Sequence, residues 1–150
     1  MFGRKKKEEP KNKAETTQDA FSSYATKLRN AAGKYTASDD LVKALQGFVF
    51  LDPKKITIPY ETAVQEAREF EEKGNMLRAS VAHRTAAGLA LYKGDVAALR
   101  RHLEEYERVG QRTEFRPIKE NAETVVKIGQ EFYGNLDEKK EVSEHGQSGD

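Results

Sequence analysis

The sequence predicts an all-α protein of about six antiparallel helices. Apolar residues recur at intervals of three and four along most of the chain, which is the period of a helix with one buried face. Two pairs, Gly74-Asn75 and Gly94-Asp95, lie 20 residues apart. Glycine ends a helix in the left-handed conformation at low cost, and Asn or Asp accepts hydrogen bonds from the first N–H groups of the next helix. Both pairs therefore predict a tight turn between two helices.

The composition fits one small and highly charged domain. The chain has 150 residues, of which 37% are hydrophobic and 34% are charged, and its formal net charge is +1. An average domain has roughly 25% charged residues, so we expect a thin core under a charged exterior. There is no cysteine, which excludes disulfides, cysteine zinc sites and thiol catalysis. No apolar run reaches the length of a membrane span or forms a secretory signal, so we expect a cytoplasmic protein.

The two ends of the chain differ in charge from each other. Residues 1–15 hold six bases and three acids, and residues 137–150 hold five acids and two bases. Both ends have too little apolar surface to offset the entropy of ordering the chain. We therefore expect a disordered basic tail at 1–15, a single helical domain at 16–135 and a disordered acidic tail at 136–150.

The first part of the domain predicts two helices, at 17–33 and 39–51. Ser38 is a suitable cap for the second helix, and Asp39 and Asp40 place negative charge in its first turn, where the helix dipole favours it. The apolar faces are formed by Phe21, Tyr24, Leu28, Ala31 and Tyr35 in the first helix, and by Leu41, Leu45 and Phe48 in the second.

The end of the second helix has two interpretations. Residues 48–51 and 56–58 are rich in β-branched and aromatic side chains and flank Asp52-Pro53, a pattern that also fits a short β-hairpin around a type I turn. The helix is favoured because its apolar stripe starts well before these residues. Pro53 ends the helix under either interpretation.

The middle of the chain predicts three further helices, at 59–73, 76–93 and 95–110. Pro59 suits the first turn of the first of these. The helix at 76–93 has apolar residues along two lines, which is typical of a helix packed between neighbours. These lines are Ala79, Ala82, Ala86 and Leu89 on one side, and Leu77, Val81, Gly88 and Leu91 on the other. We expect this helix to be the centre of the fold.

The last two helices differ in how much apolar surface they carry. The helix at 95–110 has a single stripe, formed by Val96, Leu99, Leu103 and Tyr106, so we expect it to be half exposed. A final helix is predicted at 117–134, beginning with Pro117. Its inward side is formed by Ile118, Ala122, Val125, Gly129 and Phe132.

Two local patterns resemble the tetratricopeptide repeat family. Phe50-Leu-Asp-Pro53 at the end of a helix is similar to the end of such a repeat, and the spacing of Ala67, Phe70, Ala79 and Ala86 is similar to that of a repeat hairpin. Small residues let paired helices nest closely, and the aromatic residue fills the space between turns. The resemblance implies three helical hairpins and a concave surface that binds a protein or peptide.

A second family offers an alternative for the middle of the chain. Residues 60–110 also resemble a microtubule-interacting-and-trafficking domain, a three-helix bundle that receives a helix of a partner protein. Both resemblances imply an interaction module, and we favour tetratricopeptide-like helical hairpins.

No catalytic or metal-binding motif appears in the sequence. His145 lies in the predicted acidic tail, His83 follows Ala82 and is interpreted as a hydrogen-bonded histidine at the edge of the core, and His102 is interpreted as a surface residue. There is no zinc-protease, serine-hydrolase or phosphate-loop signature. We therefore expect a protein that is not an enzyme and has no cofactor or metal.

Basic residues are concentrated in the second half of the domain. Arg101, Arg108 and Arg112 have spacings that place them on one helical face. One interpretation is a basic groove for an acidic peptide or a phosphate group. The other is a solvated surface balanced by neighbouring glutamates, and this is favoured. The basic run at residues 4–7 also suits an anionic membrane surface or nucleic acid, but two glutamates follow it at once.

The sequence therefore predicts a non-enzymatic adaptor that binds a partner protein or peptide on its helical surface. The residues predicted to contact the partner are Arg68, Arg78, Arg84, Arg100 and Arg101. The alternative is a nucleic-acid-associated protein that uses the basic N-terminal tail and the same arginines. Binding to nucleic acid weakens steeply with salt, whereas an apolar protein contact is far less sensitive, so salt dependence separates the two hypotheses.

Overall fold

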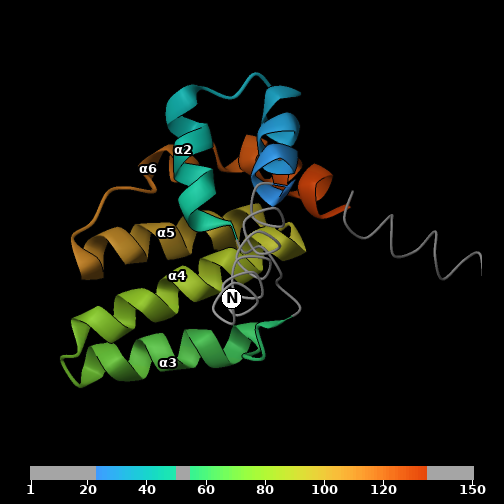
Figure 1. The fold of residues 1–150 in the computed structure, drawn as a ribbon. Coiled ribbons are helices and arrows are strands. Elements are labelled where there is room, and N and C mark those ends of the chain that lie inside the picture. Colours follow the sequence, from blue (N-terminus) through green and yellow to red (C-terminus); the bar gives the residue numbers. More distant parts are fainter. Residues whose placement is uncertain (1–22, 50–54, 135–150) are drawn as a thin grey trace, which may run out of the picture.

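A computed structural model describes residues 23–49 and 55–134, and these ranges contain helices and loops without any strand (Figure 1). The all-α prediction is confirmed for this part of the chain. Two further helical segments at residues 23–33 and 122–134 accompany the named helices. The named helices are α2 (Asp39–Phe48), α3 (Tyr60–Glu72), α4 (Met76–Lys93), α5 (Val96–Gly110) and α6 (Arg116–Glu120).

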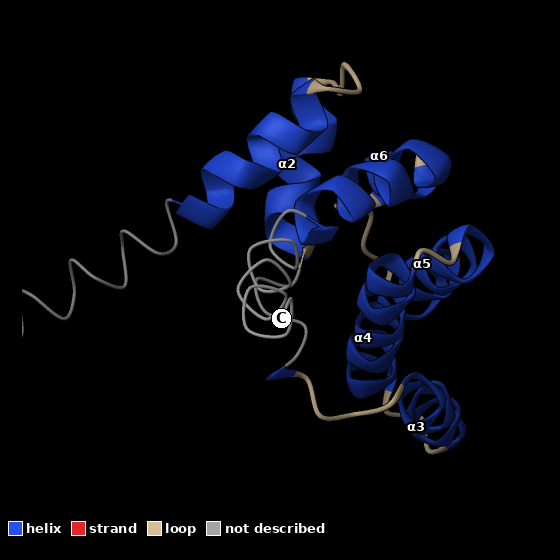
Figure 2. Ribbon diagram, turned by 90° about the vertical axis from the view of Figure 1, so that its right-hand side faces the viewer, coloured by secondary structure: helices blue, strands red, loops and turns tan. Residues whose placement is uncertain are grey.

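The helices form two groups. Helices α3, α4 and α5 run antiparallel and lie side by side, and the second group, formed by residues 23–33, α2, α6 and residues 122–134, packs on the α4–α5 side (Figures 1 and 2). Helix α3 is therefore at the edge farthest from α2 (Figure 2). Helix α4 was predicted to be the centre of the fold; it packs against both α3 and α5 and is the centre of the first group.

The two predicted turns of the first group have the expected geometry. Gly74 and Gly94 adopt φ values of 76° and 82°, in the left-handed region. The side chain of Asn75 accepts a hydrogen bond from the backbone N–H of Arg78 at 3.2 Å, and Asp95 accepts one from Ala98 at 3.0 Å. The predicted glycine stop and polar cap are both confirmed, and the same arrangement sets α3, α4 and α5 antiparallel.

The core lies where the two groups meet. Gly129 lies against α4 so closely that an added Cβ atom would stand 2.8 Å from Cδ1 of Leu91, so the absence of a side chain allows the segment 122–134 to contact α4. The largest fully buried side chains in the described residues are Phe48, Phe132, Leu45, Leu91, Leu99, Leu103, Ile118, Ile128 and Val125. This interface buries the C-terminal half of α4. In the described structure, the N-terminal half of α4 packs only within the layer formed by α3, α4 and α5.

Helix α2 ends earlier than predicted. Its last residue is Phe48 instead of residue 51, and Val49 already has extended backbone angles of φ −68° and ψ 132°. Neither Val49 nor residues 55–59 belong to a strand, so the described parts of the alternative hairpin are not paired. Residues 50–54, which include Pro53, lie outside the described residues.

The prediction of one helix at 117–134 is wrong, because Asn121 interrupts it. This residue has φ −118° and ψ 33°, and its side-chain amide donates to the carbonyl of Pro117 at 2.8 Å. An asparagine that bonds to nearby backbone competes with regular helix bonding. The chain therefore continues as α6 and then as a separate helical segment at 122–134.

Helix α5 has an unexpected residue at its C-terminal cap. The helix ends at Gly110, as predicted, but the left-handed conformation that follows it is taken by Gln111, with φ 53°. The predicted tails at 1–15 and 136–150 lie outside the described residues. Among the residues that the structure describes, no helix combines the length and hydropathy that crossing a membrane requires.

Candidate functional site

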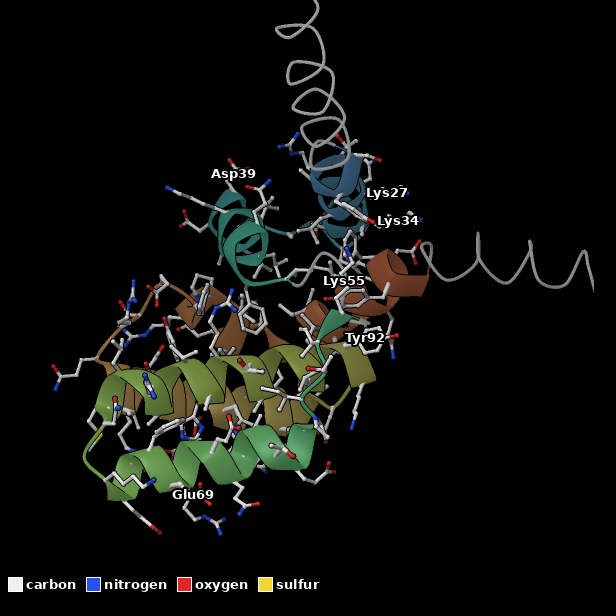
Figure 3. The ribbon with its side chains drawn as sticks, turned by 60° about the horizontal axis from the view of Figure 1, so that its bottom comes forward. Lys27, Lys34, Asp39, Lys55, Glu69 and Tyr92 are labelled. Atoms are coloured by element: carbon white, nitrogen blue, oxygen red, sulfur yellow. The ribbon has the colours of Figure 1, made fainter. Side chains whose placement is uncertain are left out.

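The α3–α4 pair has two faces with different surroundings. On one face the pair contacts α5, through a hydrogen bond between Tyr60 and His102 and an ion pair between Glu71 and Arg108. We call this the inner face. Among the described residues, no helix packs on the opposite face along the half of α4 that begins at Met76 (Figure 3). We call this the outer face.

A groove runs between α3 and α4 on the outer face. It has a volume of about 320 Å³, and we call it the α3–α4 groove. Its lining is mostly apolar, with one acid and one base. The lining residues are Ile58, Ala63, Glu66 and Phe70 from the α3 side, and Leu77, Arg78, Val81, Ala82 and Thr85 from α4.

The groove exposes large aliphatic side chains. Leu77 is 70% exposed and Val81 is 54% exposed, and neighbouring Met76 is 45% exposed. Isolated exposed aliphatic residues are ordinary, but these three belong to consecutive turns of one helix and lie beside a groove. A contiguous apolar surface of this kind is typical of a binding site for another protein.

The exposure of Leu77 and Val81 follows from where the second group of helices packs. The predicted second apolar line of α4 is buried at Gly88 and Leu91, the half that meets residues 122–134. The same line is uncovered in the first half of the helix. The prediction that α4 is buried on two sides is therefore confirmed for its C-terminal half and wrong for its N-terminal half.

Leu77 also borders a second hollow, between α4 and α5. This hollow has a volume of about 340 Å³. It is lined by Met76, Leu77, Ser80, Val109, Gly110, Gln111 and Arg112. The two helices approach closely here, since a Cβ atom added to Gly110 would stand 3.0 Å from the Cβ of Ser80. Leu77 thus forms an apolar ridge with a hollow on either side.

The two walls of the α3–α4 groove carry opposite charge. Helix α3 contains five glutamates and one arginine, whereas α4 contains two arginines, one lysine and no acid. Glu66 and Arg78 represent these charges in the groove lining, and the guanidinium of Arg78 lies 5.8 Å from the ring centre of Phe70. A partner that fits the groove therefore meets an acidic side and a basic side.

The inner face holds a chain of hydrogen-bonded polar side chains. Tyr60 Oη lies 2.7 Å from His102 Nε2, and His102 Nδ1 lies 3.3 Å from His83 Nδ1. Arg101 donates to the Tyr60 oxygen at 3.2 Å. Because arginine only donates, we assign the Tyr60 hydroxyl hydrogen to His102 Nε2, and the His102 Nδ1–H to His83 Nδ1. The proton of His83 then lies on Nε2, which is buried without a hydrogen-bond partner.

Both histidines are neutral at physiological pH. Burial, together with nearby His83 and Arg101, lowers the pKa of His102 to about 4 against the opposing effect of Glu105 and Asp95. Burial also lowers the pKa of His83, against the negative charge of Glu105 and Glu71. Neutral imidazoles suit this chain, because each neutral ring has one N–H donor and one acceptor nitrogen, and the acceptor nitrogen of each ring is used.

His102 is the residue that sequence interpretation placed wrongly. It was interpreted as a surface residue, but it is only 3% exposed. A signal was available, because His102 follows Leu99 by three positions and precedes Tyr106 by four, on the buried stripe of α5. The interpretation of His83 as a hydrogen-bonded histidine is confirmed, and it is 8% exposed.

The five arginines predicted to contact a partner occupy different environments, and of these five only Arg78 lines the α3–α4 groove. Arg84 links α4 to α2, donating to the carbonyl of Gly47 at 2.7 Å and lying 5.6 Å from the ring centre of Phe48. Arg101 serves the inner face, and Arg68 and Arg100 are exposed on α3 and α5.

The predicted basic face on α5 is largely matched by acids. Arg108 pairs with Glu71 and Glu105, and Arg112 pairs with Glu114 at 3.0 Å. Glu107 pairs with Arg116 and Lys119 in the same region. Within the described ranges, no three His, Asp or Glu side chains lie together as metal ligands would.

The comparisons with known proteins give no further guidance, since the chain matches no protein-family model, no curated protein and no solved structure. The resemblance to tetratricopeptide repeats and the one to microtubule-interacting-and-trafficking domains both stay predictions. The candidate site therefore depends on the geometry of the α3–α4 pair alone.

Proposed function

We propose that this protein is a non-enzymatic interaction module that binds a partner protein in the α3–α4 groove. The observation that carries the proposal is the apolar outer face, where Leu77 and Val81 are mostly exposed beside a groove between two helices. Burial of one such side chain stabilises a complex by about 1.5–3 kcal/mol, so a partner that covers both gains a substantial part of a specific affinity.

The shape of the groove suits a helix of the partner. It runs between two antiparallel helices, and its α4 wall presents Leu77, Val81 and Thr85 at intervals of four residues. An amphipathic helix binds such a surface through its own apolar residues at the same spacing.

The packing of α3 against α4 is consistent with the predicted tetratricopeptide-like hairpin. Ala67, Ala79 and Ala86, which carry the resemblance, are all fully buried in the described structure. Phe70 lies at the groove instead of being buried by a further hairpin. In an array of hairpins, the outer face of one hairpin is a place where another helical element packs. The exposed groove is consistent with a partner in that place.

The nucleic-acid alternative has less support. Of the arginines that this alternative uses, Arg84 is held against α2 and Arg101 donates to Tyr60, and the neighbouring Arg108, Arg112 and Arg116 are each paired with a glutamate. Phosphate binding requires basic side chains that are not already neutralised by neighbouring acids. We therefore treat nucleic-acid binding as an outcome that the experiment must be able to reveal.

The proposal is tested by affinity capture from an extract of the native cell, with and without nuclease. The wild-type chain is compared with Val81→Asp, which places a charge in the groove, and with Ala97→Asp, which places the same charge on an exposed site of α5 outside the groove. Circular dichroism and thermal unfolding establish that both variants fold.

We expect a defined protein that survives nuclease and is captured by the wild type and Ala97→Asp but lost with Val81→Asp. Capture of nucleic acid alone, or of a protein that binds both variants equally, contradicts the proposal. Raising the salt concentration distinguishes these cases further, because an apolar contact is retained and a phosphate contact is lost.

A further inference from the structure

We propose that the partner in the α3–α4 groove is the same groove of a second copy of this chain, in a two-fold symmetric dimer. This inference rests on the proposed function and names the partner of the same site. It is carried by the charge and the layout of the two groove walls, which are complementary to themselves after a two-fold rotation.

The two helices that form the groove have opposite charges. Helix α3 has five acids and one base, and α4 has three bases and no acid. In the groove lining these charges are Glu66 on the α3 wall and Arg78 on the α4 wall, because Glu71 pairs with Arg108 and Arg84 is held against α2. A matching partner therefore places a base near Glu66 and an acid near Arg78. The chain itself offers this arrangement, since its own α4 is the basic helix and its own α3 is the acidic one.

Only one kind of two-fold axis uses this complementarity. An axis that lies between the copies and runs parallel to the helices sets α3 of each copy over α4 of the other. An axis perpendicular to the helices would set α3 over α3, with acids facing acids. A two-fold interface contains every contact twice, so both the favourable pairs of the first axis and the repulsive pairs of the second occur twice.

The heights of the side chains along the helices agree with this axis. Phe70 and Leu77 lie four residues before and three residues after Gly74, and the helix rise is about 1.5 Å per residue, so both stand at a similar distance from the turn. A rotation about an axis parallel to the helices preserves that distance. It therefore places the exposed Leu77 ridge of each copy over Phe70 of the other.

The charged residues next to this apolar pair match in the same way. Glu69 and Arg78 lie beside Phe70 and Leu77 in sequence, and both are exposed. Glu69 extends outward from α3 in Figure 3. The rotation brings Glu69 of each copy to the height of Arg78 of the other, so two ion pairs flank the apolar contact. Met76 and Val81 extend the covered surface on either side of Leu77.

The dimer is tested by sedimentation velocity of the full chain over a range of concentrations. We expect the wild type to reach twice the mass of the 16.9 kDa chain as concentration rises. Val81→Asp is expected to raise the dimer dissociation constant by roughly 100-fold, because it buries a charge in an apolar contact. Ala97→Asp, with the same charge outside the groove, is expected to leave it unchanged.

A charge exchange tests the orientation. Glu69→Arg and Arg78→Glu are each expected to weaken the dimer by about tenfold, and the double variant to recover most of the wild-type affinity. Circular dichroism establishes that all variants fold. Recovery is expected only when α3 of one copy faces α4 of the other.

Several results would overturn the inference. One is a wild-type chain that remains monomeric up to about 100 μM, a level at which even a weak specific dimer forms. Another is a dimer that Val81→Asp does not weaken, since the contact then lies elsewhere. If the chain is monomeric but capture of another protein depends on Val81, the dimer is wrong and the proposed function stands. If neither association depends on Val81, both fall.

Discussion

The two faces of the α3–α4 pair reverse the usual distribution of polar and apolar side chains. The inner face, which is buried against α5, contains the hydrogen-bonded chain of Tyr60, His102 and His83. The outer face, which is open to solvent, exposes Leu77 and Val81. Polar groups are stable inside when each finds a partner, and large aliphatic groups are favourable outside only when something covers them.

The inner face maintains the fold, whereas the outer face is the surface proposed to bind a partner. If this division is correct, changes on the inner face alter stability and leave association intact. Changes on the outer face do the opposite. Each prediction below tests one side of this division, beginning with the largest expected effect.

His102→Ala is expected to destabilise the fold by about 4 kcal/mol. The change removes a buried ring and leaves the Tyr60 hydroxyl hydrogen without an acceptor and the His83 Nδ1 without a donor, and each loss contributes. Urea unfolding monitored by circular dichroism measures the effect. A loss below about 1 kcal/mol would show that the inner chain contributes little to stability.

Acid is expected to weaken the fold through the same residue. The pKa of His102 is about 4 in the fold against an ordinary value of 6.5, so the unfolded chain binds more protons between these pH values. The contribution is fully present above about pH 6.5 and is lost as pH falls toward 4, by roughly 3 kcal/mol in total. The lowered pKa of His83 acts in the same direction.

The measurement is the unfolding free energy of the wild type and of His102→Gln from pH 7 to pH 4.5. Glutamine retains a hydrogen-bonding group for Tyr60 but does not titrate, so the variant is expected to lose the part of the pH dependence that His102 contributes. Carboxylates titrate in both proteins and cancel in the difference. Equal slopes in the two proteins would contradict the assignment of His102 as the acid-sensitive group.

Tyr60→Phe is expected to destabilise the fold by about 1–2 kcal/mol. It removes one hydroxyl, leaves His102 Nε2 without its donor, and preserves the ring that packs against His102 with centroids 5.4 Å apart. Thermal unfolding measures the loss. An effect equal to that of His102→Ala would mean that ring packing, not the hydrogen bond, is disturbed.

Leu77→Ala is expected to change stability by less than about 0.5 kcal/mol, because the side chain is 70% exposed and has little to lose. The unfolding measurement is made at a protein concentration below the onset of association. In sedimentation or capture experiments the same variant is expected to bind weakly. A large loss of stability in the dilute protein would place Leu77 in the core and remove the outer face from consideration.

Local chemistry made much of the fold predictable from sequence. Gly74-Asn75 and Gly94-Asp95 fix the turns through backbone and side-chain preferences of adjacent residues, so α4 begins and ends where predicted. The break at Asn121 and the early end of α2 at Phe48 were not predicted. Each depends on the backbone conformation of a single residue, Asn121 or Val49, and the sequence does not distinguish that conformation from a helical one.

The candidate site was harder to predict because it depends on contacts between distant segments. Leu77, Val81, Gly88 and Leu91 form one apolar line in the sequence, yet only the last two are covered. Nothing within α4 distinguishes its two halves. The difference arises from where residues 122–134 pack. The five predicted arginines lie in different environments for the same reason, because contacts with distant segments, such as that of Arg84 with Gly47, decide where each side chain lies.

The most direct test of the division between the two faces is the solvent exposure of individual methyl groups in the full chain, measured by NMR with a soluble paramagnetic probe. In dilute protein, the methyls of Leu77 and Val81 are expected to be strongly broadened and those of Leu99 to be protected. At high protein concentration, Leu77 and Val81 are expected to become protected as well. If both methyls stay exposed at every concentration and after addition of a captured partner, the outer face is not an interface and the account is contradicted.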